Sequence, residues 1–236
     1  VLVTGASRGI GAAIAARFAK EGAVVIVNYS GNDEAADRTV ENILAANGKA
    51  EKYKCQVDSY EETEKMITYI MDKYKRIDIL INNAGVGYYG LHEELNAAKI
   101  KEIVRTNFEA PMILSQLVLR QLKKSKGFII NISSVTALQP SPHGCAYGAS
   151  KAGLTAFSRS LFDEARKYGV KVVSVHPDMT STDLYRNADF KEDEDMAAHL
   201  EPQEVAQTVE YIINIRDGAV VQEITIKPQF HRIRRK

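Results

Sequence analysis

The sequence lacks the features that mark several protein classes. It has only two cysteines in 236 residues and no tryptophan. Cys55 and Cys145 show neither a disulfide-rich pattern nor metal-ligand spacing, so we expect reduced thiols and no metal site. No apolar run reaches the ~20 residues that a membrane-spanning helix needs. These absences disfavour a disulfide scaffold, a metalloprotein and a membrane protein.

An excess of charge of one sign is also missing. Lys and Arg number 31 against 30 Asp and Glu, which leaves a net charge of +1. No overall field therefore favours nucleic acid or an anionic membrane. The chain length fits one domain, residues 1–236, with a sizeable buried core. We expect a cytoplasmic protein with a small-molecule substrate.

Short apolar runs alternate with amphipathic stretches along the whole chain. This alternation predicts an α/β fold: a single-domain, Rossmann-like, doubly wound parallel sheet of about seven strands, with helices on both faces. We expect one or two helices over 97–124, started or kinked at Pro111, and a strand over 170–175 that is broken by Pro177. Ligands of such sheets bind beyond the carboxyl ends of the strands.

Tyr147 and Lys151 lie one turn apart on an expected helix. A phenol with a pKa of ~10 is a poor acid–base catalyst at neutral pH. A lysine ammonium on the same helix face would lower that pKa. A hydroxyl of Ser133 or Ser134, at the end of an apolar run, would hold a carbonyl oxygen. Tyrosine, lysine and serine together could then donate a proton to an alkoxide as it forms. The alternative is a surface pair on an amphipathic helix.

A glycine-rich turn, Gly5 to Gly11, follows the first apolar run and precedes a helical pattern. Glycines let the backbone approach a pyrophosphate, and the helix N-terminus offers free N–H groups. The spacing is G-x-x-x-G-x-G rather than the better-known G-x-G-x-x-G. The alternative is an ordinary strand–helix turn, but the position at the first strand of an alternating chain favours a nucleotide site.

In this order and at these intervals, the motifs resemble the short-chain dehydrogenase/reductase family over almost the whole chain. The resemblance implies a nicotinamide dinucleotide and hydride exchange with a carbonyl or an alcohol. The segments that carry it are Thr4 to Gly11, Asn82 to Gly85, Asn107, Ile132 to Ser134, Tyr147 to Lys151 and Pro177 to Thr182.

The resemblance also implies roles for individual residues. Tyr147 would be the general acid, Lys151 would lower its pKa and bind the nicotinamide ribose, and Ser134 would be the catalytic serine. Asn107 would hold a water molecule in a proton relay that reaches Lys151. Besides Tyr147 and Lys151, the expected cofactor-binding residues are Gly5, Ser7, Arg8, Gly9, Ile10, Gly11, Asn28, Gln56, Val57, Asn83, Ala84, Gly85, Pro177, Thr180 and Thr182.

The choice of cofactor has a physical argument. A carboxylate at the end of the second strand would accept hydrogen bonds from the adenosine ribose and repel a 2′-phosphate. That strand ends Val27-Asn28-Tyr29-Ser30, without a carboxylate, and the Arg8 guanidinium could pair with the phosphate. We therefore predict NADP(H); the alternative for Arg8 is a solvated surface charge.

Three positions depart from the family pattern. Gln56 stands where an adenine-binding aspartate is frequent, Asp178 stands where glycine is usual, and the C-terminus lacks the paired glycines of many 3-oxoacyl carrier-protein reductases. Residues 181–199 match the position of a substrate lid. The basic tail, residues 231–236, is expected to be a solvated end or a subunit contact. Family members commonly form dimers or tetramers, so we expect a homo-oligomer.

The leading hypothesis is an NADPH-dependent oxidoreductase that reversibly reduces a carbonyl to an alcohol. One alternative is a 3-oxoacyl-[acyl-carrier-protein] reductase of fatty-acid synthesis, whose carrier partner the tail could help to dock. Another is a non-catalytic NADP(H)-binding regulator, although a regulator has no need of a proton donor.

Overall fold

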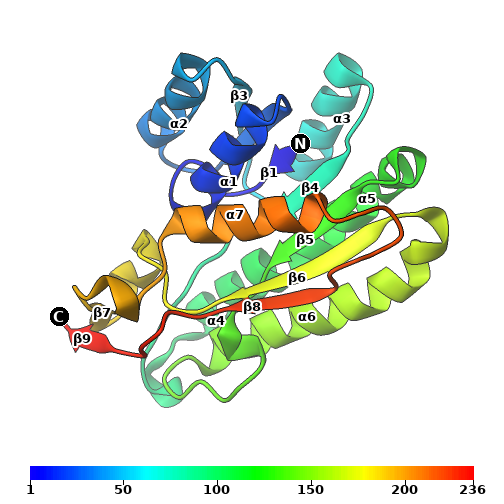
Figure 1. Ribbon diagram of the computed structural model, residues 1–236. Helices are drawn as coiled ribbons and strands as arrows, with labels where there is room; N and C mark the ends of the chain where they lie inside the picture. The colour runs from blue at the N-terminus through cyan, green and yellow to red at the C-terminus, as the bar shows by residue number, and fades with distance from the viewer.

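A seven-stranded parallel sheet forms the centre of the molecule (Figure 1). The computed structural model describes residues 1–236. The strand order is β3-β2-β1-β4-β5-β6-β8, so the chain runs outward from β1 to β3 and returns to the other side of β1 at β4. This reversal creates a switch point between β1 and β4, and the predicted doubly wound sheet is confirmed. The strands are β1 Leu2–Val3, β2 Val24–Tyr29, β3 Lys49–Lys54, β4 Ile79–Asn82, β5 Phe128–Ile132, β6 Lys171–Pro177 and β8 Glu223–Ile226.

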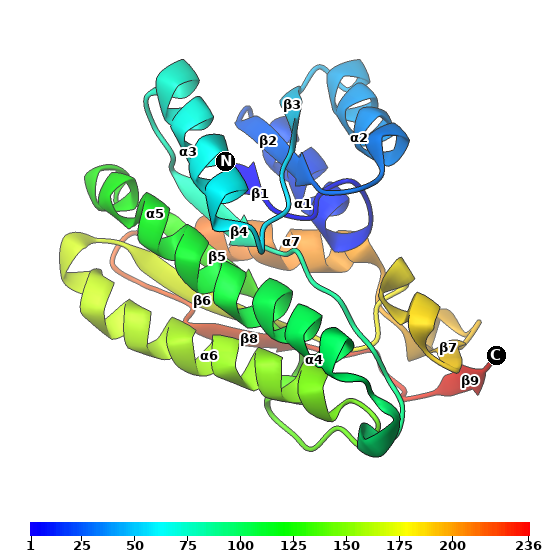
Figure 2. The ribbon, with the colours of Figure 1, turned by 180° about the vertical axis from the view of Figure 1, so that it is seen from behind.

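Helices cover both faces of this sheet. Helices α1 and α7 pack against each other on the face seen in Figure 1, and α3, α5 and α6 cover the opposite face, seen in Figure 2. No helix combines the length and the apolar character needed to cross a membrane. The helices are α1 Gly9–Lys20, α2 Asp33–Ala45, α3 Tyr60–Tyr74, α4 Ala97–Val104, α5 Ala110–Ser125, α6 Cys145–Ala165 and α7 Pro202–Ile213.

The core consists of two apolar layers, one on each face of the sheet. Alternate residues of a strand enter opposite layers because successive side chains point to opposite faces. Leu2 packs with α3 and α5 residues such as Met66 and Leu114, whereas Val3 packs with α1 and α7 residues such as Ile14 and Val209. Each large apolar side chain buried in this way contributes roughly 1.5–3 kcal/mol. The two layers therefore fix the strand ends on which any site depends.

Buried amides connect the strand ends to α6. Asn82 donates a hydrogen bond from Nδ2 to Oδ1 of Asn131 (2.8 Å), and Asn131 donates from Nδ2 to Oγ of Ser158 on α6 (2.7 Å). All three side chains are buried. An unpaired amide here would carry a large desolvation cost, so this chain of bonds sets the position of α6 relative to β4 and β5.

One predicted boundary is confirmed and another needs correction. The segment 97–124 contains α4 and α5, joined by a π-helical turn, Arg105–Glu109, and Pro111 starts the second helix as predicted, in its first turn. Pro177 was expected to break the sixth strand; instead it is the last residue of β6 and pairs with Ile226. The missing N–H of a proline is tolerated at that terminal position, because the next amide, of Asp178, donates to Ile226.

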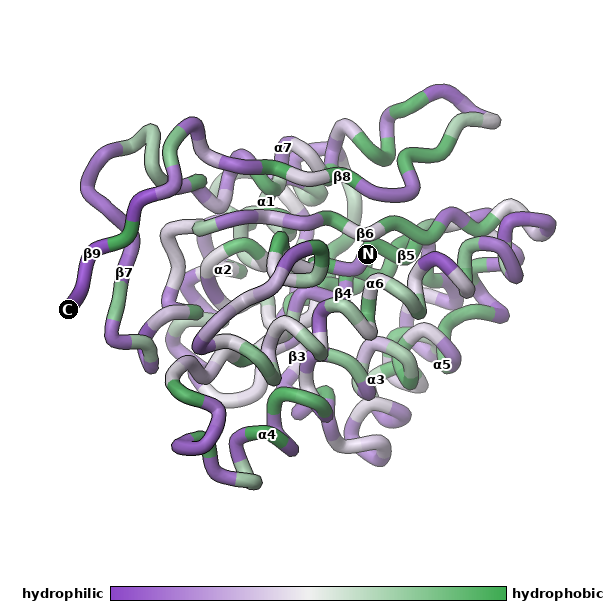
Figure 3. Tube along the Cα trace, turned by 90° about the horizontal axis from the view of Figure 1, so that it is seen from below, coloured by the Kyte–Doolittle hydropathy of each residue, from purple (hydrophilic) through white to green (hydrophobic).

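The basic tail is exposed, as expected of a solvated end, but it also forms a strand that was not predicted. Its strand β9, Ile233–Arg235, pairs antiparallel with β7, Phe190–Glu192, which lies within the expected lid. Arg234 forms ion pairs with Asp193 and Glu194, and Arg232 pairs with Asp195. Figure 3 shows this corner of the molecule largely in hydrophilic colours. The acidic lid and the basic tail therefore neutralise each other.

Candidate active site

A cleft of about 590 Å³ opens at the carboxyl ends of the central strands. It runs from the glycine turn, past the segments that follow β2, β3 and β4, to Tyr147 and the lid. All the predicted site residues line it except Gly11 and Asn107. The sequence motifs thus converge on one cleft, at the sheet edge where a doubly wound fold binds its ligands.

The glycine turn leaves no room for a Cβ at two of its glycines. Gly5 has a φ of +59°, and a Cβ there would lie 2.8 Å from the Cα of Ala84. A Cβ on Gly11 would lie 2.4 Å from Nδ2 of Asn83, so Gly11 serves packing rather than the cleft. Because α1 begins at Gly9, its free N–H groups lie beside the cleft, where an anionic pyrophosphate would bind.

Two predicted cofactor residues use their side chains to support the glycine turn. Asn28 accepts a bond from the Gly5 amide and donates one to the Cys55 carbonyl (2.9 Å). Asn83 donates to the carbonyls of Thr4 (2.8 Å) and Gly5 (3.1 Å). These amides hold the glycine turn in shape, while their residues also line the cleft.

Tyr147, Lys151 and Ser134 lie together at the inner end of the cleft. Their exposed fractions are only 4%, 4% and 8%. Tyr147 and Lys151 project from the first turns of α6, and Ser134 follows β5. Lys151 donates from Nζ to the Ile132 carbonyl (2.8 Å), and Ser133 donates from Oγ to the Lys151 carbonyl (3.1 Å). Ser133 therefore supports the helix, and Ser134 faces the cleft.

The expected lowering of the tyrosine pKa is wrong for this structure. Burial raises the pKa of Tyr147 to about 12, and a hydrogen bond with Ser134 opposes the shift only in part. Burial also lowers the pKa of Lys151 to about 8. The Lys151 ammonium lies 5.8 Å from the centre of the Tyr147 ring and donates to a backbone carbonyl, so desolvation outweighs its attraction for a phenolate. At neutral pH Tyr147 is a protonated acid.

Asn107 lies in the π-helical turn and is fully buried. Its Oδ1 accepts from the Val86 amide (2.8 Å), and its Nδ2 donates to the Val86 carbonyl (2.9 Å) and to Ser150 (3.2 Å). A Cβ placed on Gly85 would lie 3.4 Å from Asn107 Oδ1 and 3.6 Å from Lys151 Nζ, so both side chains approach this point. The asparagine anchors the segment after β4; its expected water relay stays a prediction.

Comparison with known proteins places this geometry in a family. The family model "short chain dehydrogenase" matches residues 1–193. The chain belongs to that family. A 3-oxoacyl-[acyl-carrier-protein] reductase from Synechocystis sp. is 34% identical over 215 residues, which cover 89% of this chain and 87% of the relative.

Solved structures agree with this short chain dehydrogenase in fold. A metagenomic short-chain oxidoreductase in complex with NADP has a TM-score of 0.84 and 31% identity, and the match covers 98% of this chain and 96% of that one. A single-residue variant of actinorhodin polyketide ketoreductase with NADPH has a TM-score of 0.87 and 29% identity, with 96% of this chain and 95% of that one covered.

Sequence reasoning did not predict that three rings of this short chain dehydrogenase gather around Tyr147. Tyr89 lies 5.8 Å from Tyr147, 5.8 Å from Tyr185 and 5.3 Å from Phe190, measured between ring centres. We call these four residues the aromatic cluster. Tyr185 and Phe190 come from the lid and Tyr89 from the segment after β4. The only sequence signal for Tyr185 and Phe190 was that aromatic residues are scattered through a polar lid.

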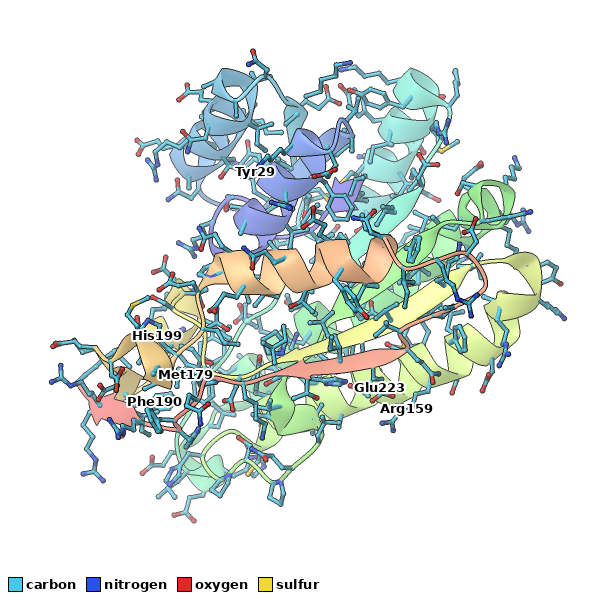
Figure 4. All side chains as sticks on the ribbon, viewed as in Figure 1. Tyr29, Arg159, Met179, Phe190, His199 and Glu223 are labelled. Atoms are coloured by element: carbon cyan, nitrogen blue, oxygen red, sulfur yellow. The ribbon has the colours of Figure 1, made fainter.

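A buried histidine behind Ser134 was also missed. Nδ1 of His176, on β6, lies 3.2 Å from the Ser134 carbonyl oxygen and donates to it. Nε2 lies 3.5 Å from a carboxylate oxygen of Glu223, which pairs with Arg159 beside it (Figure 4). Burial lowers the pKa of His176. A neutral His176 therefore fixes the Ser134 backbone through one nitrogen and leaves the other without a hydrogen-bond partner.

The predicted phosphate-binding arginine contacts the lid. Nη1 of Arg8 lies 3.1 Å from a carboxylate oxygen of Asp183, and the two side chains are 50% and 61% exposed. Both residues line the cleft. A pair so exposed contributes little stability, so the guanidinium can exchange this partner for a ligand at low cost.

Proposed function

We propose that this short chain dehydrogenase uses NADPH to reduce a carbonyl to an alcohol. The observation that carries the proposal is the convergence of Ser134, Tyr147 and Lys151 at one end of a cleft whose other end is a glycine turn. A proton donor and an anion-binding turn in one cleft are what dinucleotide-dependent reduction requires.

The residues present suit a dinucleotide. The α1 N-terminus and the glycine turn offer N–H groups for the pyrophosphate, and Lys151 lines the cleft, from which its ammonium would reach a ribose hydroxyl. Gln56 and Val57 border the adenine end, and Pro177, Thr180 and Thr182 border the other end. When bound, the cofactor supplies a hydride to the carbonyl carbon and leaves as NADP⁺.

The protein supplies the proton and the orientation. Ser134 donates a hydrogen bond to the substrate carbonyl oxygen and holds it beside Tyr147. Tyr147 is protonated at neutral pH, because its pKa is about 12, and it transfers its proton to the oxygen as negative charge develops there. The Lys151 ammonium stabilises the phenolate that results. The carbonyl thus gains one hydride and one proton.

The end of β2 supports NADPH over NADH. Tyr29, Ser30, Gly31 and Asn32 line the cleft there, and none carries a carboxylate. The next acid along the chain, Asp33, accepts from Tyr29 (2.6 Å) and Lys54 (2.7 Å) instead. With no carboxylate at the end of β2 to repel it, a 2′-phosphate could pair with Arg8, which also lines the cleft.

A 3-oxoacyl-[acyl-carrier-protein] reductase is the second candidate, favoured by the similarity to the Synechocystis enzyme of that activity. The proposed lid at 181–199, a homo-oligomeric assembly and a cytoplasmic location belong to the same proposal and rest on family resemblance. Size-exclusion chromatography with light scattering tests the assembly.

The decisive experiment follows NADPH oxidation by its absorbance with a panel of ketones, 3-oxo acids and 3-oxoacyl thioesters. We expect turnover by the wild type and a loss of about 10²–10⁴-fold in Tyr147→Phe, with NADPH binding retained by fluorescence titration. Tyr60→Phe, an exposed tyrosine on α3, is the control. NADPH binding without turnover of any carbonyl would instead favour the non-catalytic regulator.

A further inference from the structure

We propose that the aromatic cluster selects a compact, uncharged carbonyl compound with a flat apolar substituent, such as an aryl ketone. The inference rests on the proposed function and assigns its substrate class. It disfavours an acyl chain delivered on a long anionic carrier arm, and so decides between the two candidate functions.

The first argument is the composition of the substrate end of the cleft. Tyr147 and Tyr185 line the cleft, and behind them Tyr89 and Phe190 fill the space. The rings meet at tilted and edge-on angles of 34–70°, a geometry that lets one more flat group join the stack. A substrate whose carbonyl is held by Ser134 lies beside Tyr147, so its substituent can reach Tyr185, the other ring of the cluster that lines the cleft.

The second argument is charge. The carboxylates of Asp178 and Glu192 lie close enough to raise the pKa of Tyr185, in addition to the larger effect of its burial. Glu192 belongs to β7, close beyond Phe190, and accepts a bond from Ser181 (3.2 Å). An anionic substrate group in this chamber would be repelled by these acids, whereas a neutral group meets no such repulsion.

The third argument is the closure of the lid. Strand β9 pairs with β7, and Lys236 donates from Nζ to the carbonyls of Tyr185 (2.8 Å) and Arg186 (3.2 Å). Three cations of the tail, Arg232, Arg234 and Lys236, are thus occupied by the lid rather than offered to a phosphorylated carrier arm. Phe190 lies in β7, which pairs with the tail, and the Tyr185 carbonyl accepts from Lys236, so the tail holds these two rings of the aromatic cluster in place (Figure 4 labels Phe190).

Steady-state kinetics with matched substrates test this inference. We expect kcat/KM for acetophenone to exceed that for acetoacetate, an anionic ketone, and for acetoacetyl-phosphopantetheine by at least about tenfold. Equal or reversed preference would overturn the inference while leaving carbonyl reduction intact. Failure to turn over any of the three, with NADPH bound, would overturn both.

Variants at Tyr89 connect the preference to the cluster. Tyr89→Leu is expected to raise KM for acetophenone about three- to tenfold, with little change in kcat, and to leave butanone unaffected. Tyr89→Phe keeps the ring and is expected to restore the wild-type KM, which excludes a general folding defect. Tyr88→Leu is the matched control, because the Tyr88 ring lies beneath Lys99 and its hydroxyl binds Glu102, outside the cluster. A Tyr89→Leu enzyme with an unchanged acetophenone KM would contradict the assignment.

Discussion

The floor and the rim of the cleft are held by different forces. At the floor, Ser134, Tyr147 and Lys151 are buried and fixed by hydrogen bonds to strand ends and to α6. At the rim, the lid is held by exposed ion pairs to Arg8 and the tail, and by one short two-stranded sheet. Buried polar bonds are costly to break and insensitive to salt, whereas exposed pairs contribute ~0–1 kcal/mol each and are screened.

This contrast indicates that the floor and the rim have different roles. The reacting groups of the proposed mechanism need one geometry, and the floor provides it before any ligand binds. The proposed lid would have to admit substrate and release product, and weak exposed pairs permit such motion. Changes at the floor should therefore alter kcat strongly, and changes at the rim should alter KM and salt dependence modestly.

The largest effect is expected for Lys151→Met. The variant should lose about 10²–10⁴-fold in kcat. Its free energy of unfolding should also rise by about 1–2 kcal/mol. Lowering the Lys151 pKa to about 8 costs the folded protein ~3 kcal/mol, which the variant regains, and the lost hydrogen bond to Ile132 offsets part of this gain. Urea unfolding and NADPH oxidation measure both, with Lys124→Met, in the last turn of α5, as control. A variant less stable than the wild type would show that burial of the charged Lys151 does not destabilise the folded protein.

The pH dependence sharpens the same point. Lys151 is charged below its pKa of about 8, so kcat for reduction should be level below pH 8 and fall up to ~tenfold per unit above it. Stability should change in the opposite sense: the unfolded chain binds more protons between about pH 8 and 10.5, so stability rises with pH over that window. A kcat that is constant to about pH 10 would contradict this role.

Arg8→Ala tests the cofactor preference assigned to this residue of the rim. Loss of the guanidinium should raise KM for NADPH about tenfold and change KM for NADH little, because only NADPH carries the 2′-phosphate. Arg38→Ala, an exposed arginine paired with Glu34 on α2, is the control. Equal effects on both cofactors would remove the argument for NADP(H) specificity.

The smallest effect is expected for Arg234→Ala in the tail. Removing its pairs with Asp193 and Glu194 should raise KM for a ketone about two- to threefold and leave kcat unchanged. Added NaCl should raise the wild-type KM for the ketone toward the KM of the variant, since salt screens these exposed pairs. A large loss of kcat would mean that the tail, like the floor, affects the chemical step.

Much of the fold was predictable because its signals are local. Apolar runs and helical spacing predicted the doubly wound sheet, and the motifs fell at strand ends by necessity in a parallel sheet. The tail strand was unpredictable, because β9 pairs with β7 from a distant part of the sequence and the pairing depends on charges of opposite sign. The π-helical turn has no periodic signal in so short a segment.

The site divides in the same way. Motifs predicted which residues meet, but not how burial would act on them, so the pKa of Tyr147 was expected to fall and instead rises. His176 and the aromatic cluster were not predicted because both depend on partners brought by other elements, Glu223 from β8 and Phe190 from the lid.

The amide chain from Asn82 through Asn131 to Ser158 has a genetic consequence. It is remote from any substrate, yet it sets the rotation of the helix that bears Tyr147 and Lys151. A screen for inactive alleles that still accumulate as folded protein would therefore recover conservative replacements at positions 131 and 158, far from the chemistry they disable.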